Sequence, residues 1–492
     1  MSIKASVTQK GLELNIDEVK KTFGNDGYKK LLRKFIIRYK SPIGTFYLEK
    51  KNYTIDENNL ILPRFCVEKL LSNDIIYDLN VDLPEGNNIL IDFLGVPTYN
   101  QKILADHILN NFYNKKDIGC CGVTAFLLAG GGKTFLSMYL MGILKKKTLI
   151  VVPNTYLLDQ WYELLLEFTS GVTIGKYYGK EKKDGDIVVA IVNSLTKEYF
   201  TIDKKIIHSM EYFKEFGFVV LDESHTYCTE SFKVIYNRFQ TTYMLGLSAT
   251  PNERPYNLDS ISHLNIGPVL IADEIPGFKK IDNKFDASVE IIKYNGPNEF
   301  TRSIVNKKTN MISTPHMIDN IIADTKRNIL IVKSICKLIE KKLNIFIFSE
   351  RRAHLEVLQE LFNEYTENKY TELTSIEDYE NNIILYGSST KDNIEEARTN
   401  SRIIFTTYAY SSTGVSINRM TGLILATPRR SKSVQIIGRI FRLNKEYNSI
   451  RRYIIDIVDN KTIFKTQLYS RMSAYKEREC DIEKNEISHI NI

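Results

Sequence analysis

Short apolar runs alternate with longer segments of helical periodicity over most of the chain, from about residue 94 onward. Pro, Gly, Asn, Asp or Ser bounds each run, and this alternation is typical of βαβ units in which helices cover both faces of a parallel sheet. The sequence therefore predicts an α/β fold with two parallel sheets. The predicted strands are 123–128, 148–152, 187–191, 218–221 and 244–247 in the first half, and 345–348, 402–405, 422–426 and 453–457 in the second.

Changes in this pattern divide the chain into five predicted parts. Residues 1–90 mix a basic stretch with β-rich runs and predict a small α+β accessory domain. Two α/β lobes follow at 91–275 and 326–464, separated by a connector at 276–325 where the periodicity weakens. Residues 465–492 form a basic tail with an amphipathic helix, whose charged face suits solvent or nucleic acid equally well. The basic residues of that tail include Lys465, Arg471, Lys476 and Arg478.

Composition narrows the class of protein without selecting an activity. With 492 residues, 43% of them hydrophobic and 25% charged, the chain has the composition of a soluble globular protein. The net charge of +7 permits a polyanionic partner but does not require one. The six cysteines are scattered, without metal-ligand spacing, and no apolar run reaches membrane-spanning length. A soluble protein of a reducing, intracellular compartment is expected, with no membrane association.

A glycine-rich loop follows the first predicted strand and precedes a helical segment. The loop contains Gly130, Gly131, Gly132, Lys133 and Thr134. Backbone N–H groups at such a helix start point toward phosphate oxygens, Lys133 supplies a charge to the β- and γ-phosphates, and the Thr134 hydroxyl reaches Mg²⁺. Leu127 stands where the strict motif has glycine, so the match is to its relaxed form. A glycine turn followed by a chance Lys-Thr pair is the alternative.

The strand 218–221 ends in two adjacent acids, Asp222 and Glu223. Asp222 is suited to hold Mg²⁺ through water, and Glu223 to orient and deprotonate an attacking water, which are the two roles that nucleotide hydrolysis requires. The alternative is an acid pair that caps a helix after a buried strand. The glycine loop upstream favours the catalytic interpretation.

The glycine loop, the DESH sequence at 222–225 and the SATP sequence at 248–251 resemble motifs I, II and III of superfamily 2 helicases in order and spacing. The resemblance implies two tandem RecA-like lobes that bind ATP and Mg²⁺. It also implies that Gln101 reads the adenine base. His225, Ser248 and Thr250 are then expected to couple hydrolysis to movement along nucleic acid.

The second half carries the sequence QIIGRIFR at 435–442, which resembles motif VI of the same superfamily. The resemblance implies that Arg439 and Arg442 neutralise charge on the γ-phosphate, while Gln435 takes part in coupling. Gly414 matches motif V and is expected to help close the cleft around the nucleotide. Motif V often reads GxD, but Ser416 stands at the position of the aspartate that contacts the ribose or the arginines in the family.

Within superfamily 2, the chain resembles the poxvirus-type transcript-release helicases and the phage recombination-repair helicases. The resemblance rests on the DESH box followed by Thr226 and Tyr227, the Gln-Trp pair at 160–161, and the GVSIN and QIIGRIFR sequences. It implies a monomeric or weakly associating DNA-dependent ATPase that translocates 3′ to 5′ and acts on branched DNA or displaces transcripts. Partners in transcription or replication machinery, and residence in host cytoplasm or a virion, would follow for a viral protein.

Two alternatives stay open at this point. An ATP-dependent RNA helicase has the same fold, and DExH proteins also unwind RNA. An inactive nucleic-acid clamp is the alternative from a different class, but loss of Lys133, Glu223 or one of the arginines would have indicated it, and all are present.

Overall fold

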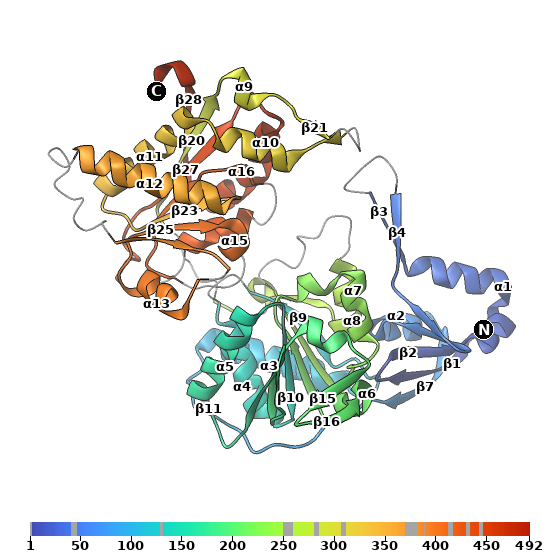
Figure 1. The fold of residues 1–492 in the computed structure, drawn as a ribbon. Helices are drawn as coiled ribbons and strands as arrows, with labels where there is room; N and C mark the ends of the chain where they lie inside the picture. Colours follow the sequence, from blue (N-terminus) through green and yellow to red (C-terminus); the bar gives the residue numbers. More distant parts are fainter. Residues whose placement is uncertain are drawn as a thin grey trace. The chain divides into compact units, whose positions relative to one another are not determined.

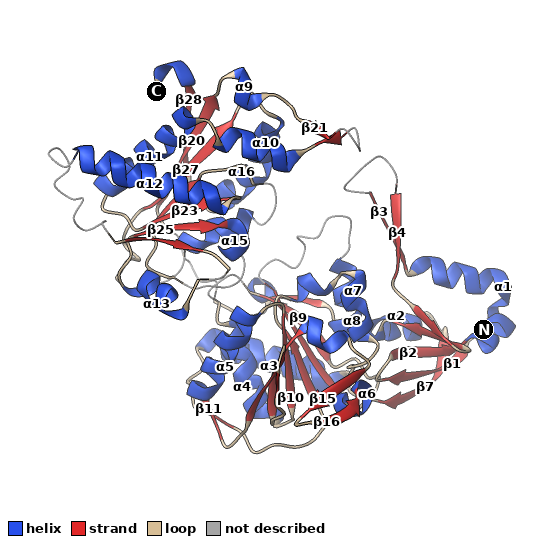
Figure 2. Cartoon of the chain, in the orientation of Figure 1, coloured by secondary structure: helices blue, strands red, loops and turns tan. Residues whose placement is uncertain are grey.

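The structure, a computed structural model, describes residues 2–40, 47–127, 131–248, 259–279, 285–306, 311–369, 381–387, 389–411, 417–429, 433–441 and 446–492. The chain forms two compact units, Met1–Lys280 and Ile281–Ile492 (Figure 1). Helices and strands alternate through both of them (Figure 2). Within these ranges, no helix is both long and apolar enough to cross a membrane.

The first unit begins with an α+β part built on a five-stranded sheet of order β5-β6-β2-β1-β7. Its helix α1 begins after Asn15, whose side chain accepts a hydrogen bond from the Glu18 N–H at 3.0 Å, and it kinks at Gly24, where φ is 69°. The predicted α+β accessory fold is thereby confirmed. Its elements are β1 (Ile3–Thr8), β2 (Gly11–Asn15), α1 (Ile16–Lys34), β3 (Ile36–Lys40), β4 (Tyr47–Lys51), β5 (Thr54–Asp56), β6 (Asn59–Leu62), α2 (Val67–Ser72) and β7 (Ile76–Asp82).

A buried arginine joins this part to the rest of the first unit. Arg64 is fully buried and donates hydrogen bonds to the backbone carbonyls of Gly119, Thr241 and Thr242. Because these carbonyls lie beside the starts of two strands of the larger sheet, one guanidinium satisfies acceptors that burial would otherwise leave without donors.

The larger sheet of the first unit has the order β13-β12-β14-β10-β17-β18-β9-β19, and every neighbouring pair from β12 to β19 is parallel. The five strands predicted in this half of the chain are confirmed. Its strands and those near it are β8 (Asp92–Phe93), β9 (Gly122–Phe126), β10 (Thr148–Val152), β11 (Thr169–Ser170), β12 (Ile174–Tyr178), β13 (Glu181–Lys182), β14 (Ile187–Ile191), β15 (Tyr199–Ile202), β16 (Lys205–His208), β17 (Phe218–Leu221), β18 (Tyr243–Ser248) and β19 (Val269–Ile271). The helices are α3 (Tyr99–Asn114), α4 (Lys133–Leu144), α5 (Thr155–Phe168), α6 (Ser209–Phe213), α7 (Glu230–Tyr236) and α8 (Asp259–Ile266).

The central strands are apolar on both faces because both faces of the sheet are covered. All five residues of β10 are buried. Ile150 and Val152 point into one hydrophobic cluster, while Leu149 and Val151 point into the other. This alternation is what the two-residue period of a strand requires. It explains why β10 is a continuous apolar run in the sequence.

The second unit is a seven-stranded sheet of order β24-β25-β23-β26-β27-β20-β28, parallel throughout. The predicted fold class of two tandem parallel-sheet lobes is confirmed. Its strands are β20 (Ala287–Asn295), β21 (Val305–Asn306), β22 (Met311–Ile312), β23 (Ile345–Ser349), β24 (Asn382–Leu385), β25 (Ile403–Thr407), β26 (Gly422–Leu425), β27 (Arg452–Asp459) and β28 (Asp481–Ser488). The helices are α9 (Asn298–Thr301), α10 (Thr314–Ile322), α11 (Thr325–Glu340), α12 (Arg352–Lys369), α13 (Lys391–Thr399), α14 (Tyr408–Ser411), α15 (Ser433–Ile437) and α16 (Leu468–Glu477).

The structure differs from the sequence-based expectation in the tail. The predicted helix is present as α16, but Arg471 on it is buried and not part of a solvated face. Its Nε lies 2.8 Å from an Asp456 carboxylate oxygen, and it also donates to the Arg429 carbonyl at 2.9 Å. The strand β28 then pairs with β20, which lies in the stretch expected to be a connector. Both segments are therefore part of the second sheet.

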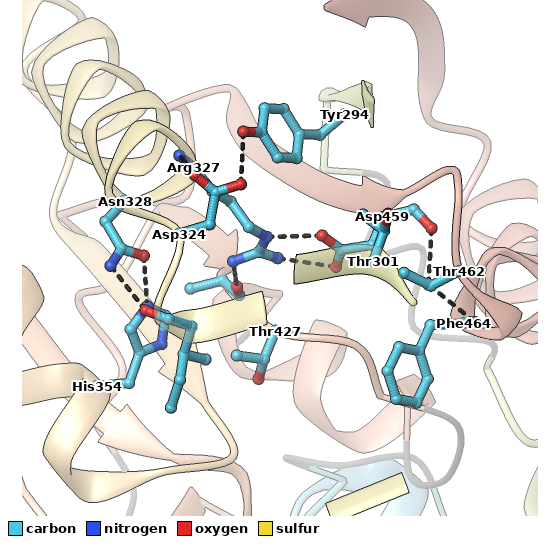
Figure 3. A network of polar contacts seen from close by, with 12 residues as sticks. Tyr294, Thr301, Asp324, Arg327, Asn328, His354, Thr427, Asp459, Thr462 and Phe464 are labelled. Atoms are coloured by element: carbon cyan, nitrogen blue, oxygen red, sulfur yellow. Dashed lines mark hydrogen bonds and ion pairs between the residues drawn. The ribbon is translucent and has the colours of Figure 1, made fainter. Parts of the chain in front are cut away.

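A buried polar network connects the carboxyl ends of β26 and β27 to the start of α11 (Figure 3). Arg327 donates to the two carboxylate oxygens of Asp459 at 2.7 and 3.0 Å, and to the carbonyl of Ala426 at 2.7 Å. Asp324 caps α11 and accepts a hydrogen bond from the Tyr294 hydroxyl at 2.7 Å. Each carboxylate in this network has donors placed around it, so the network can remain buried.

Candidate nucleotide site

Three strand ends of the first unit carry the predicted motifs, and the sheet order brings them together. The strand β18 lies between β9 and β17, with Gly246 paired to both Leu221 and Thr124. The glycine loop follows β9, the acid pair follows β17, and Ser248 ends β18. In open parallel sheets, ligands bind beyond the carboxyl ends of the strands. The three motifs therefore converge at the carboxyl ends of these strands, where a ligand is expected.

The glycine loop leads directly into a helix. Gly132 is the N-cap of α4 and has φ of 76°, a left-handed conformation that favours glycine. A Cβ atom at this position would lie 2.3 Å from the Gln101 side-chain nitrogen. Lys133 and Thr134 are the first residues of the helix and are half-buried, so the free N–H groups of its first turn lie beside them. Gly131 is also described, whereas Gly130 lies outside the described residues.

Gln101 lies beside this loop, on α3. Its side chain closes a capping box: the carboxamide oxygen accepts from the Thr98 N–H at 2.8 Å, while the Gln101 N–H donates to the Thr98 hydroxyl at 3.3 Å. Its side-chain nitrogen lies 3.4 Å from the Gly132 carbonyl oxygen. The residue expected to read adenine thus links the start of α3 to the phosphate loop.

The Asp222 carboxylate is buried at the end of β17. One of its oxygens accepts from the Glu223 N–H at 2.9 Å, and the other accepts from the Trp161 indole N–H at 2.9 Å. Burial raises the pKa of Asp222 to about 6, and the nearby charge of Glu223 adds to the rise, while the Trp161 hydrogen bond and the charge of Lys133 oppose it. The site therefore keeps a carboxylate in a place where a further cation would stabilise its charged form.

Glu223 adopts a left-handed conformation, with φ of 50° and ψ of 48°, which is uncommon for a residue other than glycine. Its Oε2 atom is buried and accepts no hydrogen bond from the described residues. His225 Nδ1 lies 3.4 Å from this atom, which is longer than a normal hydrogen bond. Strain and an unsatisfied buried oxygen together are typical of a site that is completed by a ligand.

His225 connects the acid pair to the neighbouring strand. It is buried in the 3-10 helix Ser224–Tyr227, and its Nδ1 lies 3.2 Å from the Ser248 hydroxyl at the end of β18. Thr250, the other predicted coupling residue on this side, lies outside the described residues. The structure thus brings His225 and Ser248 into contact beside Glu223.

The predicted residues of the second unit are described only in part. Gln435 is half-buried on α15, and Arg439 is buried in the 3-10 helix Gly438–Ile440. Arg442 and Gly414 lie outside the described residues.

Sequence reasoning missed a polar contact of Trp161. Trp161 is buried, but its indole nitrogen donates to Asp222 across 61 positions of sequence. Tyr227 was also missed, and its hydroxyl lies 2.7 Å from the Asp222 carbonyl and 3.1 Å from the Val151 carbonyl. The contacts of Trp161 with Asp222 and of Tyr227 with Val151 arise because β10 and β17 are adjacent, which places α5 near the acid pair. The order of strands in a sheet cannot be read from the sequence, so no signal there could have revealed them.

The family described as the res subunit of type III restriction enzymes matches residues 95–253. A relative from African swine fever virus (isolate Pig/Kenya/KEN-50/1950), provisionally named an ATP-dependent RNA helicase, is 28% identical over 384 residues, covering 74% of this chain and 70% of that protein. A protein of Acanthamoeba polyphaga mimivirus with the same provisional name is 28% identical over 448 residues, covering 90% and 78%. The transcript termination protein A18 of Yaba monkey tumor virus is 28% identical over 401 residues, covering 76% and 74%.

Two solved structures share the fold. A fragment provisionally assigned as an HsdR subunit of a type I restriction enzyme from Vibrio vulnificus has a TM-score of 0.54 at 15% identity, covering 96% of this chain and 84% of that one. The restriction-modification enzyme LlaBIII has a TM-score of 0.53 at 14% identity, covering 80% and 32%. The motifs and the parallel-sheet lobes resemble those of superfamily 2 helicases of the DExH type, and the chain is similar to viral proteins named as helicases.

Proposed function

We propose that the chain is a nucleic-acid-stimulated ATPase that uses ATP hydrolysis to move along and remodel DNA. The observation that carries the proposal is the arrangement of residues at the carboxyl ends of β9 and β17. Lys133 begins a helix after β9, the buried Asp222 follows β17, and the charge of Lys133 acts on Asp222. A phosphate cradle and an acid pair, held this close together, match the requirements of phosphoryl transfer to water.

The residues fit ATP and Mg²⁺. The glycine conformation at Gly132 leaves the loop without a side chain beside the helix start, and the first-turn N–H groups with Lys133 would hold phosphate oxygens. The Thr134 hydroxyl and Asp222 would hold Mg²⁺, which supplies neutralisation of phosphate charge when bound. Gln101, beside the loop, would contact the base.

In this proposal, Glu223 is the general base. It orients a water molecule whose oxygen forms a bond to the γ-phosphorus as the bond to the ADP oxygen breaks, and it accepts the proton that the water loses. The buried Oε2 atom of Glu223, with no hydrogen-bond donor among the described residues, supports this role. His225 and Ser248 would transmit the state of this site along β18.

The resemblance to motifs V and VI adds four residues to the proposal. Arg439 and Arg442 are proposed to neutralise charge on the γ-phosphate, Gly414 to help close around the nucleotide, and Gln435 to couple. These roles stay predictions. Loss of stimulated ATP hydrolysis in Arg439→Ala would support the role proposed for Arg439.

An RNA helicase is the second candidate. The names of the African swine fever virus and mimivirus relatives favour it, because both contain the words RNA helicase. The name of the A18 relative, a transcript termination protein, is compatible with action on either polymer of a transcription complex.

Steady-state ATPase assays of the full chain test the proposal. Rates are compared without nucleic acid and with single-stranded, duplex or branched DNA, or RNA. Lys133→Ala and Glu223→Gln are each expected to lower the stimulated rate by about 10²- to 10⁴-fold. Lys102→Ala and Glu163→Gln, exposed residues on α3 and α5, serve as matched controls that keep the wild-type rate. Stimulation by RNA alone would select the second candidate, and a rate unchanged by every polymer would refute both.

A further inference from the structure

The buried contact between Trp161 and Asp222 is not explained by packing alone. Trp161 is on the buried face of α5 with Leu157, Leu158 and Leu165, and any large apolar side chain would serve that face. A buried indole N–H needs an acceptor, and backbone carbonyls most often supply it. Here the acceptor is a carboxylate, which makes the bond charge-assisted and stronger than one to a neutral acceptor.

The contact fixes the orientation of the Asp222 carboxylate. The Glu223 N–H holds one carboxylate oxygen at 2.9 Å and Trp161 holds the other at the same distance. Two donors, one on each oxygen, define the plane of the group. Each carboxylate oxygen can accept two hydrogen bonds, so each keeps a lone pair for a further ligand.

The backbone of the same residue is held separately. The Tyr227 hydroxyl lies 2.7 Å from the Asp222 carbonyl, and the Asp222 N–H donates to the Val151 carbonyl at 3.0 Å. Backbone placement therefore does not depend on Trp161, whose hydrogen bond acts on the side chain.

We propose that Trp161 is a positioning residue that orients the Asp222 carboxylate toward Mg²⁺, and that its indole reports whether the metal–nucleotide site is occupied. The proposal rests on the proposed function, because it takes Asp222 to be the residue that holds Mg²⁺. Hydrogen-bond partners of metal-binding carboxylates typically change metal affinity or activity by about 10- to 100-fold when removed. The reporter role follows because Trp161 is the single tryptophan of the chain.

The first test uses the wild-type full chain labelled with ¹⁵N at the indole nitrogen. One tryptophan gives one indole cross-peak in a proton–nitrogen correlation spectrum. A cation at Asp222 draws electron density from the oxygen that Trp161 contacts, which weakens the hydrogen bond. The peak is therefore expected to move upfield in the proton dimension with Mg²⁺ and ADP together, and less with ADP alone. A peak that stays in place, while calorimetry shows Mg²⁺ and ADP bound, would overturn the proposal.

The second test measures the Mg²⁺ dependence of ATP hydrolysis. In Trp161→Phe the ring remains and the donor is lost, so the Mg²⁺ concentration for half-maximal rate should rise about 10- to 100-fold, with a smaller change in the rate at saturating Mg²⁺. Tyr227→Phe is the matched control, since it removes a buried donor from the backbone of the same aspartate. Its half-maximal Mg²⁺ concentration should stay within about twofold of wild type, because the carboxylate keeps both donors.

The outcomes separate the two proposals. If the wild-type chain neither hydrolyses ATP nor binds ADP, the proposed function fails. If the wild type is active and Trp161→Phe has the same Mg²⁺ dependence, the function stands and the role of Trp161 is refuted. If Trp161→Phe does not fold, the spectrum of the wild-type chain still decides the question.

Discussion

Both units bury an aspartate at the end of a parallel strand, but they treat its charge differently. Asp459, at the end of β27, is paired with Arg327 through two hydrogen bonds, and both side chains are about 1% exposed. Asp222, just after β17, is held by two neutral donors, the indole of Trp161 and the backbone N–H of Glu223. Burial, together with the nearby charge of Glu223, raises the pKa of Asp222 to about 6.

The difference separates structural from functional carboxylates. A buried charge costs free energy unless a counter-charge and hydrogen bonds compensate it. In the second unit, Arg327 supplies the counter-charge to Asp459, so the Asp459 carboxylate is already compensated within the protein. In the first unit the compensation is incomplete, and a metal ion would complete it. The contrast predicts opposite responses to the same substitution at the two positions.

The largest expected effect is on activity, at Asp222. Asp222→Asn should lower stimulated ATP hydrolysis by about 100-fold or more, because a neutral amide holds Mg²⁺ weakly and metal ions contribute several kcal/mol to such reactions. The same variant should change the stability little, because loss of the buried charge offsets the loss of one hydrogen bond: the amide oxygen accepts from Trp161, while the amide nitrogen cannot accept from the Glu223 N–H. ATPase assays and urea unfolding in Mg²⁺-free buffer measure the two quantities. A large loss of stability in Asp222→Asn would contradict the assignment of Asp222 as a functional carboxylate, in contrast to Asp459.

Asp459→Asn should show the reverse response. It leaves the Arg327 guanidinium buried with one neutral partner in place of a carboxylate, which should cost about 3–5 kcal/mol of unfolding free energy. Urea unfolding of the full chain measures the cost, with Asp481→Asn as a control at an exposed ion pair on the same sheet. The control should lose no more than about 1 kcal/mol. Equal losses at the two positions would contradict the assignment of Asp459 as a structural carboxylate.

His354 gives a smaller effect that depends on pH. Burial, with the charge of Arg327, lowers the pKa of His354 to about 3, against an ordinary value of 6.5. Its Nε2 lies 2.9 Å from the Asn328 side-chain oxygen (Figure 3). Its Nδ1 lies 2.9 Å from the Ser349 hydroxyl, so the neutral ring with its proton on Nε2 fits both partners.

Between about pH 6.5 and pH 3, the unfolded chain therefore binds a proton at His354 that the folded chain does not. Stability should fall as pH falls through this window, by up to about 1.4 kcal/mol per pH unit from this residue. His354→Gln has no imidazole to titrate. Between pH 7.5 and 5.5, the unfolding free energy of wild type should therefore fall by about 1 kcal/mol more than that of the variant. Parallel pH profiles of the two proteins would show that the fold does not lower the pKa of His354.

The sequence predicts the central strands well and the long-range polar contacts poorly. The runs at 148–152, 187–191 and 218–221 are strands with the predicted bounds, because burial on both faces makes them continuously apolar. The strand β28 was missed because its sequence, DIEKNEIS, is mostly polar, as an edge strand can be. The sequence could not show that Arg471 pairs with Asp456, since that contact depends on how α16 packs on β27.

The candidate site shows the same limit. Lys133, Asp222 and Glu223 could be predicted because each stands in a local motif that directly follows a strand. The role of Trp161 could not, because the hydrogen bond to Asp222 exists only once β10 and β17 are neighbours. Local sequence therefore predicts which residues carry chemistry, and the sheet order determines which residues orient them.

The smallest expected effect concerns backbone strain at Glu223, which distinguishes this strand end from that of Asp459. Glu223 has φ of 50°, and a left-handed conformation costs a residue with a Cβ roughly 1 kcal/mol. Glu223→Gly and Glu223→Ala both remove the carboxylate and should both be inactive, but the glycine variant should be more stable by about 1 kcal/mol. Lys145, the exposed residue that ends α4 with φ of 51°, gives the control pair. Lys145→Gly should exceed Lys145→Ala in stability by a similar amount while both keep ATPase activity. If the Glu223 variants were equally stable while the Lys145 variants differed, the conformation of Glu223 would be relaxed, and the strain would have no part in preparing the site.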